Sequence, residues 1–132
     1  MRPLLSVVIP VYNAQQYLNR CLTSVLDQDF EKGQLEVVCV NDGSTDGSGE
    51  WLDIYSSQHP EVKVIHKENG GISSARNCGM EAMSGRYFEF VDADDELIPH
   101  SILDVVNTMI MEQCEVSQFD YTRGGGITNR GI

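Results

Sequence analysis

LLSVVIPV, at residues 4–11, is an almost unbroken apolar run that is rich in β-branched residues. Such a run is typical of a strand covered on both faces, as in a parallel sheet between two layers of helices. From Ala14 to Leu26 the apolar residues then recur three and four positions apart, which predicts an amphipathic helix, and Asn13 can cap its first turn. The first residues of the chain therefore predict a strand followed by a helix that packs back on the sheet.

The same alternation continues along the chain. Further strands are predicted at Leu35–Val40, Val62–His66 and Tyr87–Val91. Helical patterns lie between and after them, around Trp51, over Ile72–Met83, and in a last helix with Pro99 in its first turn. Strands that alternate with helices in this way predict the α/β class, with a mostly parallel, Rossmann-like sheet and helices on both of its faces.

One domain is expected over residues 1–122. The remaining segment, RGGGITNRGI at residues 123–132, has no periodicity and contains three consecutive glycines. We expect it to be a disordered tail or a truncated connection to a further part of the fold.

Composition and charge exclude several classes of protein. The net charge of −11 leaves no basic stripe that could neutralise the phosphates of a nucleic acid, so nucleic acid is not an expected partner. No apolar run reaches the ~18 residues that a transmembrane helix needs, so we expect a cytoplasmic protein that meets a membrane only peripherally, at its inner face. The four widely spaced cysteines are expected to be reduced, buried thiols rather than a disulfide or a zinc site.

Polar and glycine-rich segments follow each of the four predicted strands. These segments are Pro10–Asn13, Asn41–Ser44, Asn69–Gly71 and Asp92–Asp95. In open α/β sheets, ligands bind outside the carboxyl ends of the strands, where these four segments would meet. The sequence therefore predicts a single ligand site at this edge of the sheet.

Asp92-Ala93-Asp94-Asp95 places three carboxylates within four residues. At an effective dielectric near 20, two such charges ~4 Å apart repel each other by about 4 kcal/mol. A divalent cation such as Mg²⁺ or Mn²⁺ would relieve that repulsion and would also bind substrate phosphates. The alternative is a solvated acidic turn that caps the following helix. The position directly after a strand favours the metal.

Other residues at this edge have two interpretations each. Asp42 can accept a hydrogen bond from a pyrimidine imide or a ribose hydroxyl, or it can shape its own turn. Tyr12 can stack on a base or pack against the next helix. Arg76 can pair with Asp42 or with a phosphate, or it can be an ordinary surface arginine. Asp46 is expected to cap the helix around Trp51 rather than to contact ligand.

Four segments in this order resemble the family-2 glycosyltransferases, which have the GT-A fold: SVVIPVYN, VNDGSTDGS, NGGISSARNCG and GRYFEFVDADDELIP. The resemblance covers residues 4–106. It implies transfer of a sugar from a nucleotide-diphosphate donor, most often a UDP-sugar, to a glycan or lipid-linked acceptor, with Mg²⁺ or Mn²⁺ as cofactor and inversion at the sugar carbon.

The resemblance also implies roles for individual residues. Pro10, Tyr12 and Asp42 would contact the base or ribose, and Arg76 would support the nucleotide pocket. Asp92 and Asp94 look like the two acids of the D-x-D motif and are the expected metal ligands, Asp94 directly and Asp92 nearer the ribose. The full set of expected substrate-binding residues is Pro10, Val11, Tyr12, Asn13, Asp42, Gly71, Arg76, Asp92, Ala93 and Asp94.

The sequence departs from the family after Asp95. The fold usually continues there with the acceptor site and with an Asp or Glu that deprotonates the acceptor. Neither Glu115 nor Asp120 has a matching context, so we expect this catalytic base to lie beyond Ile132 and the chain to have no transferase activity by itself. Apolar surface left uncovered would favour a homo-oligomer. The alternative function is a non-catalytic module that binds a nucleotide-sugar or another subunit.

A receiver-type phosphotransfer domain also gathers acidic residues at strand ends. That class needs a lysine at a later strand end, and neither Lys63 nor Lys67 lies after Asp92. The sequence therefore argues against it.

Overall fold

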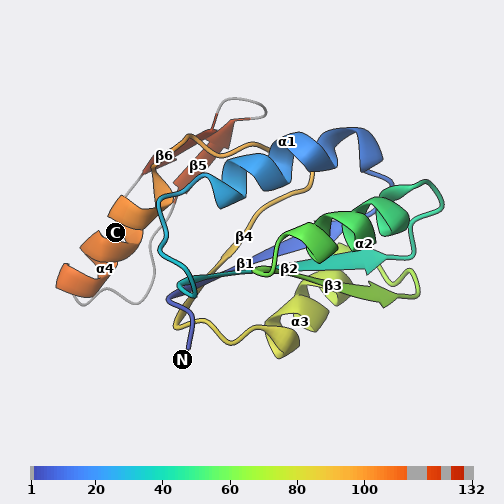
Figure 1. The fold of residues 1–132 in the computed structure, drawn as a ribbon, viewed down its shortest axis with the longest axis horizontal. Helices are drawn as coiled ribbons and strands as arrows, with labels where there is room; N and C mark the ends of the chain where they lie inside the picture. Colours follow the sequence, from blue (N-terminus) through green and yellow to red (C-terminus); the bar gives the residue numbers. More distant parts are fainter. Residues whose placement is uncertain (1, 113–118, 123–125, 130–132) are drawn as a thin grey trace.

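The computed structural model describes residues 2–112, 119–122 and 126–129 (Figure 1). Along the chain the elements are β1 (Leu5–Val11), α1 (Gln15–Leu26), β2 (Leu35–Asp42), α2 (Ser48–Gln58), β3 (Val62–Lys67), α3 (Ile72–Ala82), β4 (Tyr87–Phe90), α4 (Ile102–Glu112), β5 (Phe119–Thr122) and β6 (Gly126–Asn129). The predicted alternation of strands and helices is therefore confirmed as far as α4.

A four-stranded parallel sheet in the order β3-β2-β1-β4 forms the centre of the fold. The chain moves outward from β1 to β2 and β3, and then returns to place β4 on the other side of β1. At such a reversal of strand order the loops beyond the strand ends diverge and leave room for a ligand. The fold thus places a crevice above the carboxyl end of β1.

Helices cover both faces of this sheet, as predicted. Figure 1 shows α1 and α2 on one face and α3 on the other. On the first face, buried side chains of β1 such as Ile9 join one core with Leu22 of α1 and Leu52 of α2. On the second face, Val40 of β2 packs with Ala75 of α3. Both faces of β1 and β2 are buried, which explains their continuous apolar sequences.

The contact of α3 with the sheet depends on Gly79. A Cβ atom at this position would lie 2.3 Å from Cγ1 of Val8 in β1. Gly79→Ala should therefore push α3 away from the sheet and lower the free energy of unfolding by about 2 kcal/mol, measured by urea denaturation. Asn77→Ala, at an exposed position of the same helix, is the matched control and should change it by less than about 0.5 kcal/mol. A Gly79→Ala variant as stable as the wild type would contradict this packing.

The first turns of α1 and α2 share one capping residue. Asp46 accepts hydrogen bonds from the backbone N–H of Gln15 at 3.3 Å and of Ser48 at 2.9 Å. Its predicted capping role is confirmed, and it extends to a second helix. The prediction that Asn13 caps α1 was wrong, because Asn13 has a positive φ and its Oδ1 instead accepts from the backbone N–H of Thr45 at 2.7 Å.

The last helix of the core begins later than predicted. Pro99 was expected in its first turn, but α4 starts at Ile102. The side chain of Gln28 in the segment after α1 is buried, and its Oε1 accepts from the backbone N–H groups of Ser101 and Ile102. Its Nε2 donates to the carbonyl of Ile98 at 2.8 Å. This distant side chain satisfies the N–H groups at the start of α4 and so sets where the helix begins.

The chain after α4 includes a short antiparallel strand pair. Residues 126–129, within the segment expected to be a tail or a connection, form β6, which pairs antiparallel with β5. A short strand pair of this kind is compatible with a connection to a further part of the fold, so the expectation of a disordered tail or a truncated connection stays a prediction. The rest of 123–132, Ile132 included, lies outside the described residues.

The cysteines that the structure describes agree with the expectation of reduced thiols. Cys21 and Cys39 are buried free thiols and Cys78 is a partly buried one, while Cys114 lies outside the described residues. Within the part of the chain that the structure describes, no helix is both long and apolar enough to cross a membrane.

Candidate functional site

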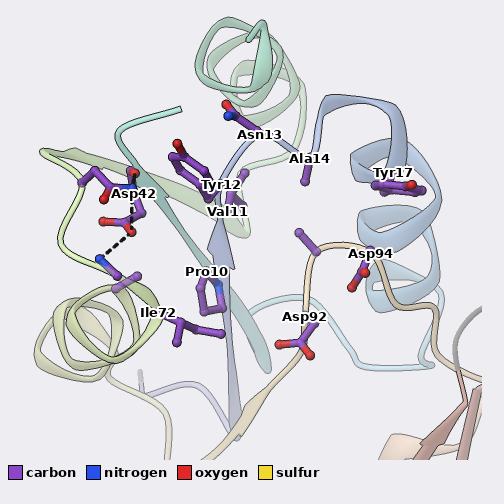
Figure 2. Close-up of a pocket in the computed structure, with 14 residues that line it drawn as sticks. Pro10, Val11, Tyr12, Asn13, Ala14, Tyr17, Asp42, Ile72, Asp92 and Asp94 are labelled. Atoms are coloured by element: carbon purple, nitrogen blue, oxygen red, sulfur yellow. Dashed lines mark hydrogen bonds between the residues drawn. The ribbon is translucent and has the colours of Figure 1, made fainter. Parts of the chain in front are cut away.

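A cleft of about 420 Å³ lies at the carboxyl ends of β1, β2 and β4 (Figure 2). It is the crevice that the reversal of strand order predicts. Its lining residues are Pro10, Val11, Tyr12, Asn13, Ala14, Tyr17, Asp42, Asn69, Gly71, Ile72, Ala75, Asp92, Ala93 and Asp94.

Every predicted substrate-binding residue except Arg76 lines this cleft. Figure 2 shows Asp42 and Tyr12 toward one end, Asp92 and Asp94 toward the other, and Pro10 between them. Segments at the ends of all four strands, with Asn69 and Gly71 after β3, therefore meet in one site, as the pattern of strand ends predicts.

Asp42 is buried at one end of the cleft and holds the loop that leads into α3. Its Oδ1 accepts from the backbone N–H of Gly70 at 2.9 Å and from Nζ of Lys67 at 3.0 Å. Its Oδ2 accepts from the backbone N–H of Gly71 at 3.0 Å. Burial alone would raise the pKa of this carboxyl, but the hydrogen bonds from Gly70, Lys67 and Gly71 outweigh it and lower the pKa. Asp42 is therefore an ionised, acceptor-only group.

Two half-exposed side chains flank this end. Tyr12 and Ile72 are each 53% exposed although both line the cleft. By contrast, Val11 and Ala75 are buried at the floor. The exposure of Tyr12 argues against its packing in the core and leaves its ring available to stack on a ligand.

At the other end, Asp92, Asp94 and Asp95 each offer a carboxylate oxygen, and these oxygens lie within 4.8 Å of one another. Three hard oxygen donors this close fit a divalent cation such as Mg²⁺ or Mn²⁺. A capping role of this turn for the next helix is not observed, because α4 begins only at Ile102, whereas a solvated acidic turn stays the alternative to a metal site.

A buried thiol of α1 forms a hydrogen bond with the backbone of the acidic loop. Cys21 of α1 donates its S–H to the carbonyl oxygen of Asp92 at 3.6 Å. Burial, together with the charges of Asp95, Asp94 and Asp92, raises the pKa of Cys21 to about 12. It therefore stays a neutral thiol and adds no negative charge to the site.

Arg76 lies beside the acidic end rather than in the cleft. Its guanidinium nitrogen is 3.6 Å from Oδ1 of Asp92, and its Cζ is 5.3 Å from the ring centre of Phe90 in β4. The suggested pairing of Arg76 with Asp42 does not occur, because Lys67 takes that place. Arg76 thus orients one acid of the cluster.

Some lining residues could not be assigned from the sequence. Asn69 donates to the backbone carbonyl of Asp42 at 3.0 Å, and only its position before two glycines indicated a loop. Ile72 and Ala75 look like ordinary members of an apolar helix stripe. Tyr17 belongs to the stripe of α1 and was expected in the core. Lys67 lies outside the lining but pairs with Asp42; from the sequence it was considered only as a lysine that does not follow Asp92, and nothing local indicated this partner.

The family model of glycosyl transferase family 2 matches residues 6–131. The chain belongs to this family. Among its family-2 relatives is glycosyltransferase GlyA of Streptococcus pneumoniae, 38% identical over 89% of this chain and 16% of its own length. Another is the uncharacterized glycosyltransferase YibD of Escherichia coli, 43% identical over 82% of this chain and 30% of its own length. The chain thus spans a third or less of the curated relatives named here.

Solved structures of glycosyltransferases confirm the GT-A type of α/β fold for this family-2 chain. Residues 1–349 of Staphylococcus aureus TarS, in complex with UDP-GlcNAc, match with a TM-score of 0.75 and 33% identity over 88% of this chain and 33% of that one. The mannosyltransferase PcManGT of Pyrobaculum calidifontis, in complex with GDP-Man and Mn²⁺, matches with a TM-score of 0.71 and 27% identity over 78% and 31% of the two chains.

Proposed function

We propose that this chain is the donor-binding part of a metal-assisted, inverting glycosyltransferase that uses a UDP-sugar. The observation that carries the proposal is one cleft with an ionised, hydrogen-bonded Asp42 at one end and, at the other, Asp92 and Asp94, which form a cluster of three carboxylates with Asp95. A nucleotide-diphosphate sugar has the matching chemistry, with hydrogen-bonding base edges at one end and a diphosphate at the other. The complexes of TarS with UDP-GlcNAc and of PcManGT with GDP-Man and Mn²⁺ support it.

The acidic end is the proposed metal site. Asp94 and Asp92 would hold Mg²⁺ or Mn²⁺, and the ion would neutralise the charge that develops on the leaving nucleotide. Arg76 keeps Asp92 in place, and the neutral Cys21 holds the backbone of the loop. An acidic protein can in this way bind an anionic donor.

The other end is the proposed nucleoside site. Tyr12 and Ile72 offer apolar surface to the base, and Asp42 accepts a hydrogen bond from its edge. Because Asp42 is tied to the Gly70-Gly71 backbone, it needs no rearrangement when the ligand binds.

For the sugar acceptor and the catalytic base, the proposal names only a class of acceptor and a general location of the base. The carboxylates that line the cleft are Asp42, Asp92 and Asp94, and all three are assigned to the donor or the metal. We propose that the base comes from residues outside the cleft and that the acceptor is a glycan or a lipid-linked glycan. The expected position of the base, beyond Ile132, stays a prediction, because the described residues do not test it.

The lack of a base within the described cleft also supports the second candidate, a non-catalytic nucleotide-sugar-binding or subunit-interaction module. Peripheral membrane contact and self-association stay predictions.

Calorimetric titration of the 132-residue chain with UDP tests the proposal. We expect binding with Mn²⁺ or Mg²⁺ present and a strong loss of affinity in EDTA, while UMP, which lacks the second phosphate, should depend less on the metal. A folded chain that binds no UDP in the presence of either metal would contradict the donor site. Incubation with UDP-sugar and a glycan acceptor is expected to give no transfer; sugar transfer by this chain would exclude the non-catalytic module and would also contradict a base beyond Ile132.

A further inference from the structure

Lys67 is the last residue of β3. The sequence pattern does not predict its contacts, and it is not part of the proposed metal site. Its side chain is 22% exposed, and its Nζ donates to Oδ1 of Asp42 at 3.0 Å and to the carbonyl of Glu68 at 2.7 Å. Lys67 does not line the cleft, so it acts on a ligand only through Asp42.

The two oxygens of Asp42 are not equally occupied. A carboxylate oxygen has two acceptor positions. On Oδ1 both are filled, by Lys67 at 3.0 Å and the Gly70 N–H at 2.9 Å. On Oδ2 one is filled by the Gly71 N–H at 3.0 Å, and the other receives only a long contact of 3.4 Å from Asn69 Nδ2. That amide makes its shorter bond, 3.0 Å, to the backbone carbonyl of Asp42. The more weakly occupied acceptor position is therefore on Oδ2.

We propose that Lys67 is a specificity-determining positioning residue, which fixes Oδ1 of Asp42 and so presents Oδ2 to the edge of the base. This inference rests on the proposed function. Uracil carries an N–H donor at N3, whereas cytosine carries a lone pair there. A fixed carboxylate oxygen accepts from uracil and repels cytosine, although the two rings have nearly the same size. Lys67 thereby favours UDP over CDP.

The glycine amides alone cannot fix this orientation. Gly70 donates to one oxygen of Asp42 and Gly71 to the other, so the backbone offers one donor on each side. Lys67 distinguishes the two sides, because it adds a charged donor at 3.0 Å on the side of Gly70, whereas Asn69 adds only a neutral donor at 3.4 Å on the side of Gly71. The difference is hidden while residue 42 is a symmetrical carboxylate, and it becomes measurable when residue 42 is an amide.

Asp42→Asn exposes this asymmetry. With Lys67 present, the amide oxygen should face Lys67 and Gly70, and the NH₂ group should take the place of Oδ2. It would then donate to N3 of cytosine, and the base preference should invert from UDP to CDP by about tenfold. In Asp42→Asn/Lys67→Met both amide orientations have one glycine donor, so the ratio of UDP to CDP affinity should fall to about one. Asp42→Asn/Lys67→Arg, which restores a cationic donor, should recover the CDP preference.

The single variants keep the test valid if an amide is not tolerated at residue 42. Lys67→Met should lower the ratio of UDP to CDP affinity about threefold, because the carboxylate can then turn and is more easily protonated. Lys67→Arg should keep the ratio, and Lys32→Met, which removes an exposed lysine elsewhere, is the matched control. Thermal unfolding of every variant establishes that it is folded.

The outcomes separate this inference from the function on which it rests. If the wild type binds no UDP with Mn²⁺, the proposed function and the role of Lys67 are both wrong. If the wild type binds UDP but the ratio is the same with and without Lys67, both with Asp42 intact and in the Asp42→Asn variant, only the role of Lys67 is wrong. An inverted ratio in Asp42→Asn that Lys67→Met removes would establish it.

Discussion

Asp94→Ala is expected to weaken the binding of UDP in the presence of Mn²⁺ about a hundredfold, which corresponds to about 2.7 kcal/mol. Asp94 lines the cleft, and its carboxylate lies in the group of acids whose oxygens are within 4.8 Å of one another. Removing it takes away a ligand of the proposed metal, and without the metal the diphosphate meets the remaining carboxylates directly. The measurement is calorimetric titration with UDP at fixed Mn²⁺ concentration.

The metal-free wild type provides the sharpest comparison. If Asp94 acts through the cation, the variant with Mn²⁺ should bind UDP as weakly as the wild type does in EDTA, and EDTA should weaken the variant little further. Asp104→Ala, which removes an exposed carboxylate on α4, should leave the affinity unchanged. Tight, metal-dependent binding by Asp94→Ala would show that the cation is held elsewhere.

Glu36→Gln is expected to lower the free energy of unfolding by about 3 kcal/mol at pH 7. Glu36 is buried near the start of β2, at the edge of the sheet opposite the cleft. One of its oxygens accepts from Ser6 Oγ and from the backbone N–H of Ser84, both at 2.7 Å, and the other accepts from Lys63. An amide would keep the first set of bonds and turn its NH₂ group toward the lysine.

The effect of this substitution should depend on pH. Burial would raise the pKa of Glu36, but the hydrogen bonds from Lys63, Ser6 and Ser84 lower it to about 2, from 4.5. The contribution of Glu36 is therefore complete above pH 4.5 and is lost as the pH falls toward 2. Urea denaturation at about pH 7 and about pH 3 should show the gap between wild type and variant narrowing at the lower pH. The exposed control Glu81→Gln should show no such gap, and a gap independent of pH would contradict the assignment.

The sheet could be predicted because its sequence signal is local and strong. Val7, Val8, Ile9 and Val11 of β1 and Val37 to Val40 of β2 are buried, and an inner parallel strand needs such a continuous apolar run. The position of the cleft followed from the same signal, since polar residues directly after such strands must meet at one edge. The residues that line it were therefore largely predictable without their individual contacts.

The partners within the site were not predictable, because they are contacts between distant residues. Arg76 could have served Asp42 or a phosphate, and its pairing with Asp92 depends on how α3 lies against β4. Lys67 reaches Asp42 because β3 and β2 pair with these two residues opposite each other. Likewise, the start of α4 is set by Gln28, 74 positions away in the sequence, and not by the local signal of Pro99.

The sheet order has one more consequence, for the size of molecule that the cleft can hold. Asp42 ends β2, and the acidic loop follows β4, with only β1 between these strands. Neighbouring strands lie roughly 4.8 Å apart, so β2 and β4 lie about 10 Å apart on either side of β1. The spacing of the strands thus limits which molecules can reach both ends of the cleft. For the proposed donor, this spacing corresponds to the reach from the edge of the base to the diphosphate, and a shorter molecule would contact only one end of the cleft.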